Sequence, residues 1–286
     1  MGYAGLTRRT LRVAVWLACA TALAAPPQRI CSVSLAGDEW LALLSPPERV
    51  VCVSTFADNP SLSNVVGFYP ASAARRVARL EPVIGRMPDL VIAAPWNDQE
   101  FLRGLKRGGI ASLMLEDVRG FEDIRAQALV LGARLGQTES ARRVVAKLDA
   151  ELMAIDRAVA DLAPPAPRVL AVSHLVVAGT STSVDALIRR AGAINLAAEA
   201  GISGHTQISL ERLLALDPEW LLLGLDETPS QEALLAAYPQ LSALRAVRDG
   251  HVVLMQPKWL TTVTPYLIEG VKDLFHRLHP GSTAGN

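Results

Sequence analysis

The sequence has few of the residues from which catalytic and metal sites are usually built. Its 286 residues include three cysteines and five histidines, with no CxxC pair and no Cys/His cluster, so a zinc-type site is not indicated. It also lacks a nucleophile elbow, a phosphate-binding loop, a GxGxxG fingerprint and an HExxH pair. We therefore expect no catalytic residues, no resident metal and no cofactor.

Neither sign of charge is in excess. The 28 lysines and arginines equal the 28 aspartates and glutamates, so composition gives no signal for binding nucleic acid or an anionic membrane surface. Beyond the N-terminal segment no apolar run approaches the ~18 residues of a membrane span. Half of the residues are hydrophobic, enough for a sizeable core. We expect a soluble monomer.

The N-terminus has the three parts of a secretory signal peptide. Residues 7–12 are basic, residues 13–24 are apolar, and the apolar run ends in the small-x-small pattern Ala-Leu-Ala. The sequence therefore predicts a signal peptide over residues 1–24, cut after Ala24, and a periplasmic mature protein. The adjacent Arg8 and Arg9 leave export by the twin-arginine route open beside general secretion.

The three cysteines have different expected fates. Cleavage before Cys19 would allow a lipid anchor there, but Trp16 fits a lipoprotein signal poorly, so the anchor is the less favoured alternative. Cys31 and Cys52 lie in matching strand-like phrases, RICSVS and RVVCVS. Neighbouring strands in that register would place the two thiols side by side. An oxidising compartment permits a disulfide, and two buried thiols remain the alternative.

Strand-like and helical segments alternate in two regions of the chain, 25–118 and 164–286. Such alternation is typical of βαβ units around a parallel sheet. The intervening residues 119–163 have no proline and a helical period. Within them, a helix of about 22 residues would begin at a plausible N-cap, Thr138, and end before the proline-rich segment 163–167. We expect an α/β protein with two Rossmann-like lobes bridged by one long α-helix and a ligand cleft between the lobes.

One phrase occurs twice. LEPVIGRMPDLVIAAPW, residues 80–96, is followed 130 residues later by LERLLALDPEWLLLGLD, residues 210–226. Each places a glutamate early in a helical stretch, then a proline and an acidic residue, then a buried strand. A helix–proline–strand connection is common and recurs by chance, but the coincidence of all three positions favours two related lobes.

These segments, in this order and spacing, resemble a periplasmic binding protein of the cobalamin and iron-siderophore class. The resemblance covers nearly the whole mature chain and rests on RICSVSLAGDEWLALL, LEPVIGRMPDLVIAAP, GTSTSVDALIRRAGAINLA and ISLERLLALDPEWLLL. It implies a substrate-binding subunit of an ABC importer that carries a small ligand to an ABC permease. It also implies that Glu81 and Glu211 dock on basic residues of the permease. Two solvated glutamates near helix N-termini are the alternative.

The ligand is expected at loops that follow the carboxyl ends of strands. Tryptophans there would suit a large, partly apolar ligand, and His205 could approach a corrin or bind a haem iron. The absence of a dense arginine cluster favours a corrinoid, with haem or a neutral siderophore next, over an anionic siderophore complex. The candidate ligand-binding residues are Trp40, Asp58, Trp96, Asn97, Thr180, His205 and Trp259.

Three other functions stay open. A periplasmic metal-ion binder would need several His, Asp or Glu side chains converging on the cleft, and His174 and His205 are the histidines that could reach it. A chelatase-like enzyme could use two similar lobes, although the predicted signal peptide argues against a cytosolic role. An exported sensor that feeds no transporter is the third.

Overall fold

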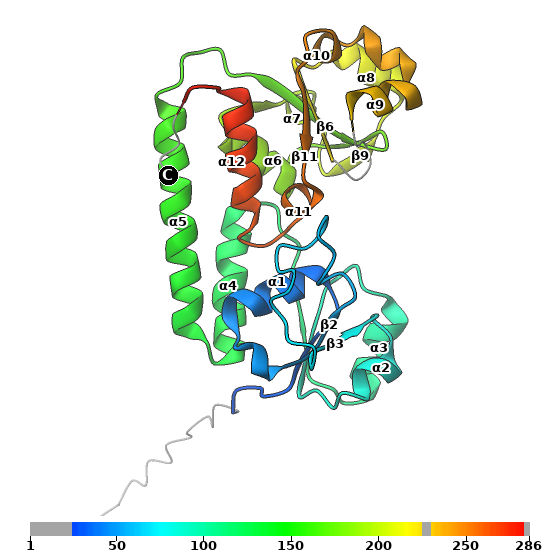
Figure 1. The fold of residues 1–286 in the computed structure, drawn as a ribbon, viewed down its shortest axis with the longest axis vertical. Coiled ribbons are helices and arrows are strands. Elements are labelled where there is room, and N and C mark those ends of the chain that lie inside the picture. Colours follow the sequence, from blue (N-terminus) through cyan, green and yellow to red (C-terminus); the bar gives the residue numbers. More distant parts are fainter. Residues whose placement is uncertain (1–24, 225–229, 283–286) are drawn as a thin grey trace, which may run out of the picture.

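The computed structural model describes residues 25–224 and 230–282. The predicted signal peptide and Cys19 lie outside this described part of the chain. The described residues form two α/β lobes, one above the other, joined along one side by two helices (Figure 1). The prediction of two α/β lobes is confirmed.

The first lobe is built on a five-stranded parallel sheet in the order β3-β2-β1-β4-β5. Alternate residues of its central strands face opposite cores, because side chains along a strand point to opposite faces. Ile30 and Ile92 join the core under α1, whereas Cys31 and Val91 join the core under α2 and α3. Its elements are β1 (Ile30–Ser32), α1 (Leu35–Leu44), a 3-10 turn (Pro47–Arg49), β2 (Val50–Ser54), β3 (Ala74–Arg76), α2 (Leu80–Ile84), β4 (Leu90–Ala93), α3 (Gln99–Arg107) and β5 (Ser112–Met114).

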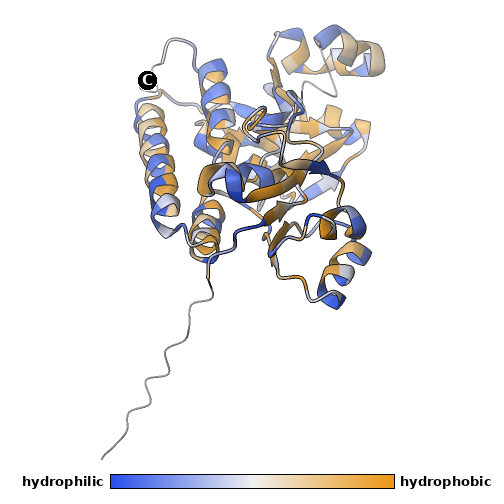
Figure 2. Ribbon diagram, turned by 60° about the horizontal axis from the view of Figure 1, so that its bottom comes forward, coloured by the Kyte–Doolittle hydropathy of each residue, from blue (hydrophilic) through white to orange (hydrophobic). Residues whose placement is uncertain are grey.

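The second lobe has a mixed sheet in the order β11-β10-β6-β7-β9, with β8 beside β6. Figure 2 shows that strands of the molecule are mostly hydrophobic, whereas its helices carry both hydrophobic and hydrophilic residues. Its strands are β6 (Arg168–Ser173), β7 (Val176–Ala178), β8 (Ile194–Asn195), β9 (His205–Gln207), β10 (Trp220–Gly224) and β11 (Val252–Met255). Its helices are α6 (Ser183–Arg190), α7 (Leu196–Glu199), α8 (Leu210–Leu216), α9 (Gln231–Ala237), a 3-10 turn (Pro239–Ala243), α10 (Arg245–Arg248), α11 (Pro257–Leu260) and α12 (Leu267–Leu278).

The second sheet is not wholly parallel, which corrects the expectation from the sequence. Strand β7 runs antiparallel to β6 and to β9. The tight turn between β6 and β7 is made by His174 and Leu175, with φ of 45° and 63°. Such a turn usually announces itself by Asn-Gly or Asp-Gly. Because neither residue is a usual turn former, the hairpin leaves no signal in the sequence.

Two antiparallel helices link the lobes. Helix α4 (Phe121–Leu135) ends at Gly136, which has a left-handed φ of 65°, and α5 (Thr138–Ala160) follows at once. The N-cap of α5 is Gln137, not Thr138 as expected, and it makes no side-chain capping bond. At ~1.5 Å per residue the 23 residues of α5 span about 34 Å. Helix α5 contacts α1 in the first lobe and α6 and α12 in the second.

The acidic residue of the repeated phrase has the same structural role in both lobes. Asp89 accepts hydrogen bonds from the backbone N–H groups of Gln28 and Arg29, at 2.7 and 3.0 Å, just before β1. Glu219 accepts one from the backbone N–H of Arg168, at 2.9 Å, where β6 begins. Each carboxylate therefore fastens the start of its lobe's first strand. This use explains why the chain repeats a proline followed by an acid.

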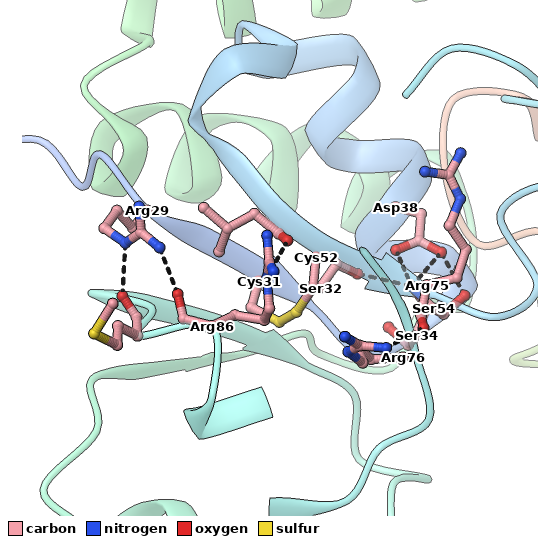
Figure 3. Close-up of a disulfide and its surroundings, with 12 residues drawn as sticks. Arg29, Cys31, Ser32, Ser34, Asp38, Cys52, Ser54, Arg75, Arg76 and Arg86 are labelled. Atoms are coloured by element: carbon pink, nitrogen blue, oxygen red, sulfur yellow. Dashed lines mark hydrogen bonds between the residues drawn. A yellow bond between two sulfur atoms is a disulfide. The ribbon is translucent and has the colours of Figure 1, made fainter. Parts of the chain in front are cut away.

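Cys31 and Cys52 are joined by a disulfide between β1 and β2 (Figure 3). The two residues are register partners in the parallel pair, with Cα atoms 4.6 Å apart. Both are fully buried. The bridge therefore ties the two strands whose following loops begin the interlobe face of the first lobe.

A buried carboxylate ties α1 to the same sheet. Asp38 is fully buried and accepts hydrogen bonds from the backbone N–H of Ser54, at 3.1 Å, and from the Ser54 hydroxyl (Figure 3). Burial raises the pKa of Asp38 from its ordinary 3.8 to about 7, against the opposing effect of hydrogen bonds from Ser32 and Ser54. The neighbouring Glu39 carboxylate raises this pKa further.

The raised pKa makes stability depend on pH through Asp38. Between about pH 4 and 7 the folded protein holds a proton that the unfolded chain releases, so the contribution of Asp38 is complete at low pH and is lost as pH rises through 7. The free energy of unfolding of wild type should therefore fall relative to that of Asp38→Asn over this window. The expected slope is at most about 1.4 kcal/mol per pH unit. Denaturant unfolding at about pH 5 and about pH 8 measures it.

Asp58→Asn is the matched control. The pKa of Asp58 is lowered by its hydrogen bond from Arg75, so Asp58 is ionised in both states above about pH 5. Its replacement should leave the slope unchanged. Parallel pH profiles for wild type and Asp38→Asn would contradict the assignment.

Candidate functional site

A cavity of about 850 Å³ lies near the junction of the lobes. It lies among the loop after β4, the segment that leads into α4, and the second lobe. Small apolar side chains and hydroxyl groups form most of its wall. The lining residues are Trp96, Asp117, Val118, Arg119, Ala171, Val172, Ser173, Val176, Ala178, Ser181, Thr182, Ser183, Val184, Gly204, His205, Leu260, Thr261 and Val263.

One wall of the cavity depends on a close approach between two backbone segments. Gly179 donates to the carbonyl of Gly204 at 2.9 Å, and Thr180 donates to the carbonyl of Ile202 at 3.0 Å. A side chain at Gly179 would place its Cβ only 2.1 Å from the Ile202 oxygen. Glycine is therefore required here. The pairing brings the serine- and threonine-rich segment beside His205.

The same segment starts α6 at the cavity. The hydroxyl of Thr182 accepts a hydrogen bond from the backbone N–H of Asp185, at 3.0 Å, and donates to the carbonyl of Gly179, at 2.8 Å. An N-cap of this kind satisfies a backbone donor at a helix start. It also places Ser181 and Ser183 in the cavity wall.

Few charged groups line the cavity. Asp117 and Arg119 contribute from the segment before α4, and His205 contributes from β9. Arg119 forms an ion pair with Asp123, Nε to Oδ2 3.0 Å, which raises its pKa. The cavity thus offers a largely apolar interior with one imidazole, one carboxylate and one paired guanidinium among its described lining residues.

Trp96 stands between this cavity and a smaller one of about 320 Å³. Its side chain is 57% exposed. The two cavities share Trp96, Thr261 and Val263. The smaller cavity is also lined by Leu35, Ala36, Glu39, Leu62 and Thr262. A ligand in the main cavity would therefore meet the exposed indole.

Two of the predicted ligand-binding residues, Trp96 and His205, line the main cavity. Thr180 lies beside it and is held by backbone pairing, while its neighbours Ser181 and Thr182 line the wall. This segment thus borders the cavity through Ser181 and Thr182 rather than through Thr180.

Three other predicted contacts do not line the main cavity. Trp40 is 0% exposed in the core of the first lobe and cannot reach a ligand. Asn97 bridges the loops after β1 and β4, accepting from the Ala94 N–H at 2.8 Å and donating to the Val33 carbonyl at 3.3 Å. Asp58 is occupied by Arg75, which donates to both carboxylate oxygens, at 2.7 and 3.1 Å.

Trp259 also does not line the main cavity. It is partly buried against the core, and the Lys258 ammonium lies 5.7 Å from the centre of its ring. The next residues along the chain, Leu260 and Thr261, take part in the wall. The prediction therefore missed the lining of this loop by one position.

Several lining residues gave no usable signal. Val172, Val176 and Ala178 look like ordinary core strand residues, and they reach the cavity because β6 and β7 form the unanticipated hairpin. Val118 and Arg119 lie where the first lobe passes into α4. Ser181 lies in the serine- and threonine-rich stretch 180–183 that the sequence indicates, and Thr261 lies two positions after Trp259.

The two glutamates of the repeated phrase are exposed in the first turns of α2 and α8. Figure 1 shows these helices at opposite ends of the molecule, both on the side away from α5. A hydrogen bond from Ser209 lowers the pKa of Glu211. Both carboxylates are accessible to a partner.

The described residues also bear on whether the protein could hold a metal ion or cross a membrane. Within residues 25–224 and 230–282, no group of three or more His, Cys, Asp or Glu side chains is placed to hold a metal ion. Over the same described residues, no helix has the length and apolar character that a membrane crossing requires.

Comparisons with known proteins agree on a family. The family model described as periplasmic binding protein matches residues 30–259, more than half of the chain. An uncharacterized ABC transporter substrate-binding lipoprotein of Bacillus subtilis (strain 168) is 23% identical over 210 residues. That match covers 70% of this chain and 65% of the relative, slightly less than two thirds of its length.

Solved structures show the same fold. A periplasmic haem-binding protein from Pseudomonas aeruginosa has a TM-score of 0.76 and 29% identity, covering 90% of this chain and 94% of that one. The periplasmic vitamin B12-binding protein of Vibrio cholerae has a TM-score of 0.71 and 19% identity, covering 88% and 97%. The chain therefore belongs to the periplasmic binding protein family.

Proposed function

We propose that this protein captures a flat metal-containing tetrapyrrole, haem in the first place, and delivers it to an ABC permease. The observation that carries this proposal is the apolar cavity of about 850 Å³ with one imidazole in its described lining. Its volume is within the roughly 300–1,000 Å³ of small-molecule sites. An extracytoplasmic location is supported by the family membership and by the predicted signal peptide.

The character of the wall favours haem over the corrinoid preferred from the sequence. Valine and alanine side chains suit the faces of a porphyrin, whose burial is driven by loss of apolar surface from water. A corrinoid carries many amide arms, each of which needs a hydrogen-bond partner when buried. The hydroxyl groups in its described wall are those of Ser173, Ser181, Thr182, Ser183 and Thr261, and that of Thr182 is already bonded to Gly179 and Asp185. The 29% identity to a haem-binding protein supports the same choice.

His205 is the residue that we assign to the metal. Imidazole is a common axial ligand of haem iron, and His205 lines the cavity from an edge strand. Arg119 lies in the same wall and could pair with a haem propionate. The ligand would be bound and released unchanged, so no catalytic residue is required.

Titration of the mature protein with haemin tests the ligand and its assignment to His205. Haemin should give a saturable Soret shift, whereas cyanocobalamin and ferric siderophores should bind more weakly. His205→Ala should change the ligated spectrum and weaken binding by roughly tenfold or more, about 1.4 kcal/mol. His276→Ala, an exposed histidine on α12, is the control and should match wild type. Saturable binding of cyanocobalamin or a siderophore but not haemin would refute the haem assignment.

Trp96 should contribute contact area to the bound ligand. Trp96→Ala should weaken haemin binding by about 1–2 kcal/mol, roughly five- to thirtyfold, without changing the thermal midpoint greatly, since the side chain is mostly exposed. Phe56→Ala removes another exposed aromatic that does not line the cavity, and it should have no effect. Equal losses in the two variants would show a general effect of aromatic removal.

We also propose that Glu81 and Glu211 dock the two lobes on the permease. Both are exposed near helix starts on the same side of the molecule. Two separated charges paired across an interface fix orientation and speed association. The repeated glutamate would then have a role distinct from the repeated acid that fastens each first strand.

Charge reversal tests the docking proposal in proteoliposomes that contain the cognate permease. Glu81→Lys and Glu211→Lys should each reduce ligand-stimulated ATP hydrolysis by roughly tenfold and leave haemin titration unchanged. Glu232→Lys is a close control, because Glu232 is also an exposed first-turn residue whose pKa is lowered by a hydrogen bond from a serine two positions earlier. An equal reduction in all three variants would argue against specific docking.

A further inference from the structure

Glu39 in α1 is a buried carboxylate with hydrogen-bond partners in both lobes. Its side chain is 1% exposed. One oxygen accepts hydrogen bonds from the hydroxyls of Thr262 and Thr264, each at 2.7 Å. Both threonines lie between α11 and α12, in the second lobe. Glu39 forms no ion pair with a described residue, so these hydroxyls serve in place of a cation.

Asn64 extends the connection. Its side-chain amide donates to the other Glu39 oxygen at 2.7 Å and to the backbone carbonyl of Lys258 at 2.8 Å. The backbone N–H of Lys258 in turn donates to the carbonyl of Ser61 at 3.2 Å. The first lobe thus holds the segment after β11 at several points.

The bound segment also borders both cavities. Thr262 and Thr264 are buried, at 8% and 0% exposure, and face Glu39. Thr261 and Val263 line both the main and the smaller cavity. The bonds that hold Thr262 and Thr264 therefore restrain the adjoining Thr261 and Val263 in the wall.

The preceding residue provides a natural contrast. Asp38 is also fully buried in α1, but its hydrogen bonds from Ser54 stay within the first lobe. Adjacent acids in one helix thus serve different connections, one within a lobe and one between lobes. Burial raises the pKa of Glu39, and hydrogen bonds from Thr264, Thr262 and Asn64 oppose that rise.

We propose that Glu39 is a positioning residue for ligand capture, which holds Thr262 and Thr264 and so sets the spacing of the lobes at the base of the cavity. Glu39 itself would not touch the ligand, because its oxygens are already bonded to Asn64, Thr262 and Thr264. The proposal rests on the proposed function only in taking the main cavity as the ligand site. The geometry that it predicts can be measured without any ligand.

The first experiment measures the distance between the lobes. Spin labels are attached to Glu100→Cys on α3 and Arg212→Cys on α8, which are both exposed positions. Pulsed electron paramagnetic resonance of the mature protein then reports the distance between the labels. The native disulfide leaves no other described thiol to label. Wild type should give a narrow distance distribution. Thr262→Val/Thr264→Val, which removes both hydroxyls at nearly constant shape, should shift or broaden it.

Two variants control for general damage. Thr262→Ser/Thr264→Ser keeps both hydroxyls and should restore the wild-type distribution. Asp38→Asn should change stability but leave the interlobe distance unchanged, because Asp38 bonds only within its own lobe. If the double valine variant fails to fold, Asn64→Ala removes the bond to Lys258 and should broaden the distribution by a smaller amount.

Haemin titration of the same variants links distance to binding. The double valine variant should bind haemin roughly tenfold more weakly, and the double serine variant should match wild type. A folded double valine variant with the wild-type distance distribution would overturn the proposal. If wild type itself binds no haemin, a shifted distribution in the double valine variant would leave Glu39 in its role and refute haem as the ligand.

Discussion

One continuous hydrophobic core holds the two lobes together, and the position of every other feature depends on it. Helix α5 buries Leu148, Leu152 and Ile155 in this core, which also contains Ile30 of the first lobe and Leu187 of the second. Protein interiors are close-packed, so pulling the lobes apart along α5 would open a costly void. None of the residues that line the main cavity belongs to α5. The lobes are thus closed along one side and can vary their spacing mainly at the other.

The polar connections at the cavity complement this apolar side. Hydrophobic burial is non-directional and roughly proportional to area, so the core does not fix one particular orientation of the lobes. Hydrogen bonds to a buried carboxylate have a defined geometry. Glu39 and Asn64 therefore supply what the core cannot, a particular arrangement of the segment 261–264. A ligand that contacts Trp96 and Thr261 would touch both lobes on either side of this arrangement.

The sequence predicted architecture better than contacts, for physical reasons. Alternating strands and helices depend on local periodicity, so the two lobes and α5 could be foreseen. So could the place of Trp96 on a loop after a strand, whereas His205, expected on a loop, begins β9. Whether a loop side chain faces a cavity depends on tertiary packing that one sequence does not display. Trp40 is buried in the core, and Asn97 is hydrogen-bonded between the loops after β1 and β4. The hairpin at His174 and Leu175 was missed because its left-handed residues are not those that usually favour such a turn.

The hydrogen bonds from Gln28 and Arg29 to Asp89 fix where the first lobe begins. They therefore set the distance that can separate this lobe from the N-terminal residue of the mature chain. A chain reaches at most ~3.5 Å per residue, so the number of residues ahead of Gln28 limits this distance. Cleavage after Ala24 leaves three residues, 25–27, ahead of Gln28, a stub of about 10 Å. A lipid on Cys19 would instead leave eight residues, 20–27, a leash of at most about 28 Å. An anchored form would therefore stay within that distance of the bilayer, with its first lobe nearest the attachment. A cleaved form would have no such limit.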